Sequence, residues 1–174
     1  MMSNSDQLVG RCVVTGIEDG RSTIISDGPG ATRFVTPIFG AVDLWQVDAL
    51  PAVVGSESTL GETIVLDPPA GGLVVRMLQF PPDAEWQGTD AFADAMGEVG
   101  AGDTHVDSDV PGMHVTDTVD VLTVVEGEIY VVLEETETLL RVGDSVVQRG
   151  TKHAWSNRSD RPAVLVATMM STTR

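Results

Sequence analysis

Residues 113–157 read MHVTDTVDVLTVVEGEIYVVLEETETLLRVGDSVVQRGTKHAWSN, and this stretch decides the fold class. Apolar and polar positions alternate along it, and the runs at 130–133 and 146–147 are rich in β-branched or aromatic residues. Gly127, Gly143 and Gly150 interrupt the alternation at positions where turns are expected. The pattern predicts short antiparallel strands joined by turns.

Two of the three histidines of the chain, His114 and His153, lie near the ends of this stretch. The residues around them resemble the two motifs of the cupin superfamily, Gly-x5-His-x-His-x3/4-Glu-x6-Gly and Gly-x5-Pro-x-Gly-x2-His-x3-Asn. The first motif is matched, with its spacing intact, at His114, Thr116, Asp120 and Gly127. The second, with one residue fewer after its first glycine, is matched at Gly143, Gly150, His153 and Asn157.

Four positions depart from these motifs. Thr116 replaces the second histidine, Asp120 replaces the glutamate, Gln148 replaces the proline and Ser108 replaces the leading glycine. A threonine hydroxyl is a poor metal ligand, and an aspartate reaches one methylene less far than a glutamate. Gln148 is interpreted as a turn residue. The resemblance covers about a third of the chain and therefore indicates the fold more strongly than it indicates an activity.

The rest of the chain is interpreted as a covering for this sheet. Residues 11–15 and 22–26 are strand-like and flank a turn at 18–20, which predicts an N-terminal hairpin. Strands are also expected at 73–80 and 163–170, and a helix at 89–99, capped by Thr89 or Asp90. We therefore expect a mostly β protein: an antiparallel cupin β-barrel or jelly roll (61–174), with an N-terminal strand extension packing on it (1–60) and one short helix.

Arg76 is the one charged residue within the predicted strand 73–80, where it shares a face with Val74, Leu78 and Phe80. It could point into the barrel or lie at a sheet edge. The edge is favoured, because burying an unpaired guanidinium costs several kcal/mol.

Composition limits the partners and the location. The chain has 174 residues, 42% of them hydrophobic, and a net charge of −16. A surface this negative disfavours nucleic acid and anionic membranes as partners. No apolar run approaches the ~18 residues of a membrane span, and the start of the chain lacks the basic and apolar regions of a signal peptide. With a single cysteine, Cys12, no intrachain disulfide is possible, so a cytoplasmic location is expected.

The candidate site contains His114, Asp120 and His153. On a straight strand, His114 and Asp120 would lie about 20 Å apart, so they can meet only if the chain reverses near residues 116–118. The cupin resemblance implies that both motifs converge inside the barrel. Two imidazoles and one carboxylate would suit Fe, Mn, Ni or Zn with open coordination positions. His105, on the preceding loop, is a further candidate ligand. The alternative is that His105 is an ordinary loop histidine exposed to solvent.

The candidate pocket walls follow from strand alternation. Leu122 and Val124 share a face with Asp120, and Trp155 shares a face with His153, while Thr116 occupies a motif position. These apolar residues point to a partly apolar ligand, although they would also suit an ordinary barrel core. A tryptophan such as Trp155 is more often a core or pocket-wall residue than a catalytic one.

Two functions remain open. The first is a mononuclear divalent-metal enzyme acting on a small organic molecule, for which the resemblance implies oxygenation, decarboxylation, isomerisation or lyase chemistry. The second is metal-free: a cupin that binds a small molecule, or one that uses a histidine with Asp120 for acid–base catalysis. In either case the resemblance implies a homodimer, in which we expect the N-terminal strands to be shared.

Overall fold

The structure is a computed structural model that describes residues 8, 10–36, 38–88, 91–98 and 106–174. Its strands are β1 (Arg11–Glu18), β2 (Arg21–Pro29), β3 (Thr32–Val35), β4 (Gly40–Val47), β5 (Leu73–Phe80), β6 (Thr118–Glu126), β7 (Glu128–Val132), β8 (Glu137–Arg141), β9 (Ser145–Arg149), β10 (Ala154–Ser156) and β11 (Ala163–Ser171). A 3-10 turn, η2 (Asp83–Glu85), and one helix, α1 (Ala91–Glu98), follow β5. Among the helices described, none has the length and apolar character needed to cross a membrane.

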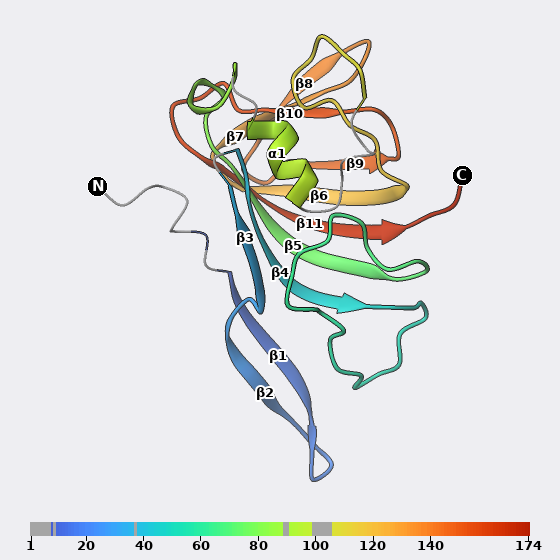
Figure 1. The fold of residues 1–174 in the computed structure, drawn as a ribbon. Coiled ribbons are helices and arrows are strands. Elements are labelled where there is room, and N and C mark those ends of the chain that lie inside the picture. Colours follow the sequence, from blue (N-terminus) through green and yellow to red (C-terminus); the bar gives the residue numbers. More distant parts are fainter. Residues whose placement is uncertain (1–7, 9, 37, 89–90, 99–105) are drawn as a thin grey trace.

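Two antiparallel sheets form the body of the molecule (Figure 1). The larger has six strands in the order β3-β4-β5-β11-β6-β9, and the smaller has three in the order β10-β7-β8. The main core contains side chains from both sheets, such as Leu122 and Leu165 from the larger and Ile129 and Val131 from the smaller. The predicted mostly β, antiparallel jelly-roll fold is confirmed. Strand pairing does not join the two sheets anywhere in the described chain, so the barrel is not closed.

The alternation in residues 113–157 explains why strands such as β6 form and which of their faces is buried. Along β6 the even-numbered residues from Thr118 to Val124 are buried and Val121 and Val125 are exposed, so one face of the strand meets the core. Gly127 allows the tight connection to β7: its φ is +71°, and an added Cβ would lie 2.6 Å from the Pro162 carbonyl oxygen.

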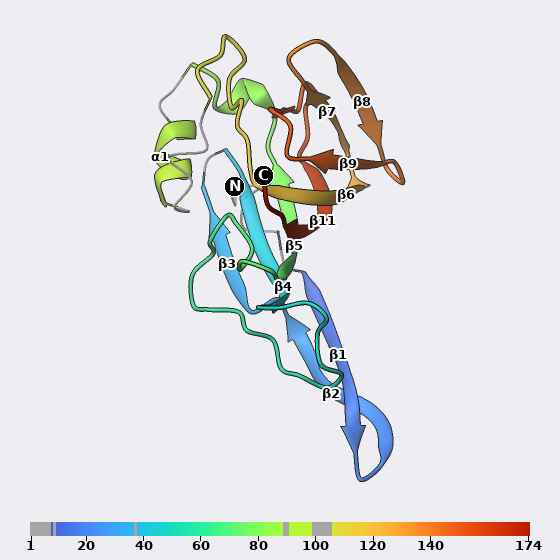
Figure 2. The same cartoon turned by 90° about the vertical axis from the view of Figure 1, so that its right-hand side faces the viewer.

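The N-terminal hairpin projects from the body as a separate two-stranded sheet (Figures 1 and 2). β1 pairs antiparallel with β2, and the turn between them passes through Asp19 and Gly20, both of which have positive φ. The sequence-based prediction of this hairpin is confirmed. β3 and β4 extend the six-stranded sheet beyond β5.

The predicted helix is confirmed as α1, and its proposed cap, Thr89 or Asp90, lies outside the described residues. Ala95 of the helix is buried in a second core cluster. The other buried members of this cluster are Ile38, Phe39, Ala41, Ile64 and Trp86. The helix therefore packs on this cluster beside β4 and β5.

Two sequence-based interpretations are wrong. Arg76 is not at a sheet edge: β5 lies between β4 and β11, and Arg76 is only 2% exposed. Its burial is possible because β4 places Asp43 directly opposite, which supplies the missing counter-charge. Gln148 is not a turn residue either. It lies in β9 opposite Asp120, and its amide donates to the Thr151 carbonyl at 2.8 Å.

Candidate functional site

A cavity lies between the inner face of the six-stranded sheet and β10 of the smaller sheet, beside Phe39 and Trp86. Its walls are mainly apolar and are formed by Ile38, Phe39, Leu66, Leu78, Phe80, Trp86, Leu122, Trp155 and Met169. The polar side chains that line it are Arg76, His114, Thr116, Asp120 and His153. The cavity can therefore surround an apolar body and offers hydrogen-bonding groups in one part of its wall.

A two-residue bridge holds the two histidines together. The His114 amide donates to the His153 carbonyl and the His153 amide donates to the His114 carbonyl, both at 2.9 Å. In such a closely paired antiparallel bridge the two side chains leave the backbone on the same side. The centroids of the two imidazole rings are 4.2 Å apart. Two residues 39 positions apart in the sequence thus form one unit.

Both imidazoles are oriented by backbone carbonyls. His114 Nδ1 lies 2.9 Å from the Gly112 oxygen, and His153 Nδ1 lies 3.0 Å from the Thr151 oxygen. A carbonyl oxygen only accepts, so each Nδ1 carries a proton. Burial, and secondarily the neighbouring His114, lower the pKa of His153 to about 3, so His153 is neutral at physiological pH.

Asp120 is the exceptional polar group of the cavity. The chain bends at Asp117, β6 begins at Thr118, and Asp120 is the next inward-facing residue, only 4% exposed. Among the described residues, Asp120 Oδ1 has no hydrogen-bond partner. Burial raises the pKa of Asp120 to about 6, while a hydrogen bond from Thr118 and the charge of Arg76 act in the opposite direction. A buried oxygen without a donor carries an energetic penalty that a ligand could remove.

Arg76 is buried in the same cavity and forms an ion pair with Asp43. Its Nε lies 2.9 Å from Asp43 Oδ1, and its two terminal nitrogens donate to the Val65 and Leu66 carbonyls at 2.8 and 3.1 Å. Burial lowers the pKa of Arg76 and raises that of Asp43, and each group's charge opposes the change in the other. The pair contributes no net charge to the cavity.

The described donor set falls short of the three-ligand metal site that the cupin resemblance implies. No three His, Cys, Asp or Glu side chains in the described part of the chain lie close enough together to hold an ion. His114 and His153 supply two imidazoles, and Asp120 lines the same cavity without joining them. His105, the further candidate, lies outside the described residues.

The remaining predicted pocket residues fall in different places. Thr116, Leu122 and Trp155 line the cavity, whereas Val124 lies deeper, in the main core. Sequence reasoning did not include Asp43, Trp86 or the strand residues around Arg76 in the site. Alternation along β5 already placed Arg76 beside Leu78 and Phe80, and that signal could have located this wall.

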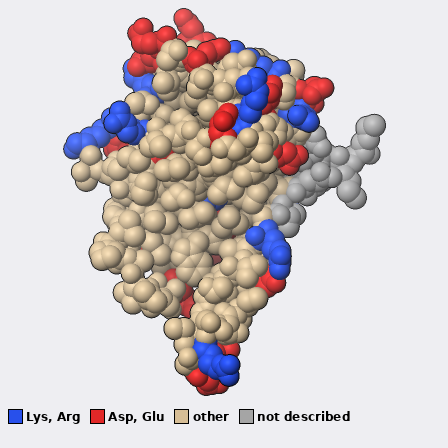
Figure 3. All heavy atoms as spheres, turned by 180° about the vertical axis from the view of Figure 1, so that it is seen from behind, with Lys and Arg blue, Asp and Glu red and all other residues tan. Residues whose placement is uncertain are grey.

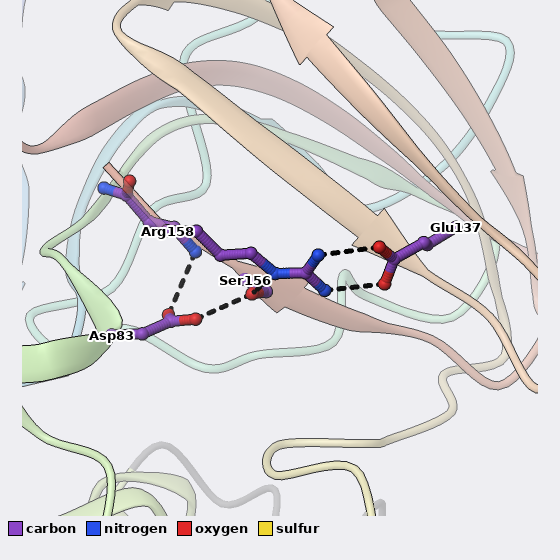
Figure 4. Close-up of polar contacts among 5 residues, drawn as sticks. Asp83, Glu137, Ser156 and Arg158 are labelled. Carbon is purple, nitrogen blue, oxygen red and sulfur yellow. Dashed lines mark hydrogen bonds and ion pairs between the residues drawn. The ribbon is translucent and has the colours of Figure 1, made fainter.

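A polar cluster behind Trp155 fixes β10 against η2 (Figure 4). Asp83 accepts hydrogen bonds from the Ser156 hydroxyl at 2.6 Å and from the Asn157 amide at 2.9 Å. Arg158 makes two parallel hydrogen bonds of 2.6 Å to Glu137, and its guanidinium carbon lies 4.1 Å from the centre of the Tyr130 ring. These contacts position the strand that carries Trp155 and adjoins His153.

Comparison with known proteins agrees with this fold. The family model of the cupin domain matches residues 100–169. Oryzines biosynthesis cluster protein J of Aspergillus oryzae is 30% identical over 161 residues, which cover 87% of this chain and 75% of that protein. The chain belongs to the cupin superfamily. This cupin is also 50% identical to phomopsin biosynthesis cluster protein C' of Diaporthe leptostromiformis over 48 residues, or 27% of the chain, and spans only about a quarter (25%) of that relative's length.

Among solved structures, a cupin 2 conserved barrel domain protein from Salinispora arenicola resembles this cupin with a TM-score of 0.42. The sequence identity is 15%, and the alignment covers 76% of each chain.

Proposed function

We propose that this cupin is an enzyme that binds a small organic molecule between its two sheets and transfers a proton to or from it. The bound molecule would have an apolar body, held by walls such as Phe80 and Trp155. Its polar part would carry a hydrogen-bond donor, a hydroxyl or an ammonium group, facing Asp120. The observation that carries the proposal is the buried Asp120 Oδ1, which has no hydrogen-bond partner among the described residues.

The charges of the cavity favour a donor over an anion. Asp43 compensates Arg76 at an ion-pair distance of 2.9 Å, and the low pKa of His153 keeps that imidazole neutral. Asp120 therefore contributes the uncompensated negative charge once its carboxyl has lost its proton. A ligand carboxylate would meet that charge in a site with little water to screen it.

Acid–base chemistry follows from the same groups. A carboxyl whose pKa is about 6 can exist in either protonation state near neutral pH, which suits a general acid or base. The names of the two relatives place them in biosynthesis clusters, which supports a small organic substrate.

The test compares three probes with one aromatic body: benzylamine, benzyl alcohol and benzoate. Calorimetry should show that the amine and the alcohol bind more tightly than benzoate. Asp120→Asn should weaken amine binding by roughly 10- to 100-fold, because a hydrogen bond to a charged group is lost. Asp117→Asn, which makes the same change at an exposed position outside the cavity, should bind like the wild type. Preference for benzoate, or equal binding by both variants, would contradict the proposal.

A divalent metal enzyme is the second candidate, and the orientation of the imidazoles favours it. Histidines that ligate metals commonly donate their other ring N–H to a carbonyl or carboxylate, as both do here. Elemental analysis of protein purified without added metal tests this candidate, with His114→Ala as the comparison. Near-stoichiometric iron, manganese, nickel or zinc that disappears in the variant would support it over proton transfer by side chains alone.

A further inference from the structure

A second concavity lies where the loop before His114, the η2 turn and β10 meet. The loop contributes Val110 and Pro111 to its wall, η2 contributes Asp83, and β10 contributes Trp155. We call this concavity the outer groove. In the described part of the chain, Trp155 lines both concavities, whereas the polar residues of the inner cavity line that cavity alone. The outer groove is therefore a separate candidate site.

The free edge of β10 is occupied at two places. In the described chain β10 pairs with β7 along one edge. At the opposite edge, His153 exchanges two backbone hydrogen bonds with His114, both at 2.9 Å. Just beyond β10, the Asn157 amide donates to the Asp83 carboxylate at 2.9 Å, and the Asn157 carbonyl accepts from the Asp83 amide at 2.8 Å. These contacts cover the two ends of the edge.

The backbone of Trp155 lies between these two contacts and faces the same way. Along a strand, the N–H and C=O groups of every second residue point to the same edge. The groups of Trp155 therefore point to the free edge with those of His153 and Asn157, and no described residue pairs with them there. An unpaired donor and acceptor on a strand edge form a template for another extended segment.

The length of the gap limits the size of that segment. Four residue steps separate His153 from Asn157, or about 13 Å at ~3.3 Å per residue. Both ends of this span are covered, so about one residue with its two flanking peptide groups can lie beside Trp155. The outer groove thus suits a single peptide residue better than a long added strand.

The charged side chains of the outer groove favour a cation. Three acidic residues line it, Asp83, Asp109 and Glu137, together with one basic residue, Arg158. Arg158 makes two hydrogen bonds of 2.6 Å to Glu137 (Figure 4). Asp83 accepts hydrogen bonds from a hydroxyl and a backbone amide, both uncharged. The ion pairs found among the described residues include neither Asp83 nor Asp109.

The end of the molecule that carries the groove is acidic. Figure 3 shows Asp and Glu side chains gathered at the upper end, where β8 and β10 lie in Figure 1. The whole chain has a net charge of −16, so a cation is attracted to this end from a distance. Val110, Pro111 and Val132 supply an apolar part of the wall, along which the methylene stem of a lysine or arginine can lie.

We propose that the outer groove binds one residue of a peptide-like ligand whose side chain is cationic. The N–H and C=O of that residue pair with the C=O and N–H of Trp155, as in an antiparallel sheet. Its ammonium or guanidinium group lies near Asp83 and Asp109, and its stem lies along Val110 and Pro111. The proposal concerns the outer groove alone and is independent of proton transfer in the inner cavity.

NMR titration of the isotope-labelled chain tests this site with three small probes. N-acetyl-lysine N-methylamide should shift the backbone amide signal of Trp155. Its glutamate analogue should bind at least about threefold more weakly, because its carboxylate meets acidic side chains. A lysine probe methylated on its backbone nitrogen cannot donate to the Trp155 carbonyl. It should bind roughly 3- to 10-fold more weakly, because one hydrogen bond is lost.

Charge reversal at Asp109 tests the same site from the protein side. Asp109→Lys should weaken binding of the lysine probe by at least about threefold, because it places a like charge beside the cationic side chain. The matched control is Asp107→Lys, at an exposed position of the same loop that does not line the groove. It changes the net charge by the same amount and should bind the probe like the wild type.

The amide spectrum of each variant shows whether the chain remains folded, and the three probes test the wild type whether or not a variant folds. A lysine probe that leaves the Trp155 amide signal unmoved at every concentration would overturn the proposal. Equal binding of the glutamate probe or of the methylated probe would do the same. So would a folded Asp109→Lys variant that binds the lysine probe as tightly as the wild type.

Discussion

Two buried charged groups line the same cavity, and they differ in whether a counter-charge lies in contact with them. On β5, Arg76 is paired with Asp43 and donates to two loop carbonyls. On β6, Asp120 is nearly as buried, yet its Oδ1 has no partner in the described chain. The charge of Arg76 is thus compensated by a contacting residue of the chain, whereas Asp120 Oδ1 has no such partner among the described residues. This difference assigns stability to Arg76 and ligand contact to Asp120, although both are buried charged groups in one wall.

The largest loss of stability is expected when the ion pair between Arg76 and Asp43 is broken. Asp43→Ala leaves the Arg76 guanidinium buried without its counter-charge, and breaking such a pair typically costs about 3–5 kcal/mol. The free energy of unfolding, measured by urea titration, should fall by that amount. A loss similar to that of a surface substitution would show that water or another group reaches Arg76.

A double variant separates the value of the pair from the cost of leaving one charge alone. Replacing both partners, with Asp43→Leu and Arg76→Met, removes the two charges together. Apolar replacements of similar volume are often neutral for buried ion pairs, so this variant should recover most of the stability lost in Asp43→Ala. If it is as unstable as Asp43→Ala, the hydrogen bonds of Arg76 to the loop carbonyls are the main contribution.

The contribution of Asp120 to the stability of the fold should depend on pH. Burial raises the pKa of Asp120 from 3.8 to about 6, so the folded chain holds this proton more tightly than the unfolded chain does. Stability from this group is therefore present below about pH 4 and is lost as the pH rises through 6, by roughly 3 kcal/mol in total. Asp120→Asn should match the wild type in stability near pH 4 and exceed it above pH 6.

His153 acts in the opposite direction over an overlapping range. Its pKa is lowered from 6.5 to about 3, so the unfolded chain takes up this proton first and stability is lost as the pH falls from about 6.5 to 3. The two groups partly cancel in the wild type. In Asp120→Asn the stability should therefore rise with pH between 4 and 6, and in His153→Gln it should fall. A difference between Asp120→Asn and wild type that does not change with pH would contradict this account.

Most of the fold could be predicted because its signals are local. Alternation and glycine placement in residues 113–157 predict strands that belong to both sheets, and the turn at Asp19 and Gly20 locates the hairpin. Leu122 and Trp155 were placed in the cavity wall from the same alternation. Alternate residues of a strand lie on the same face of the sheet. A single sequence is therefore enough to show which face of the strand is buried.

The properties of the cavity could not be predicted in this way because they depend on distant partners. Asp43 lies 33 residues before Arg76, and no local pattern shows that β4 places it opposite. The position of Asp120 relative to the histidine pair depends on how sharply the chain bends at Asp117, which motif spacing does not specify. Alternation along one strand thus shows which face a side chain lies on. The residue that pairs with a buried charge is determined by the order of the strands in the sheet.

The smallest loss of stability is expected for the solvent-exposed ion pair between Arg158 and Glu137. Arg158 and Glu137 make two parallel hydrogen bonds of 2.6 Å, yet their side chains are 46% and 41% exposed (Figure 4). Their attraction is screened by solvent and salt, and ordering two long side chains opposes it. Glu137→Gln should shift the urea midpoint only slightly, and the shift should shrink further at high salt. A salt-independent loss as large as that of Asp43→Ala would show that burial does not determine what an ion pair contributes in this protein.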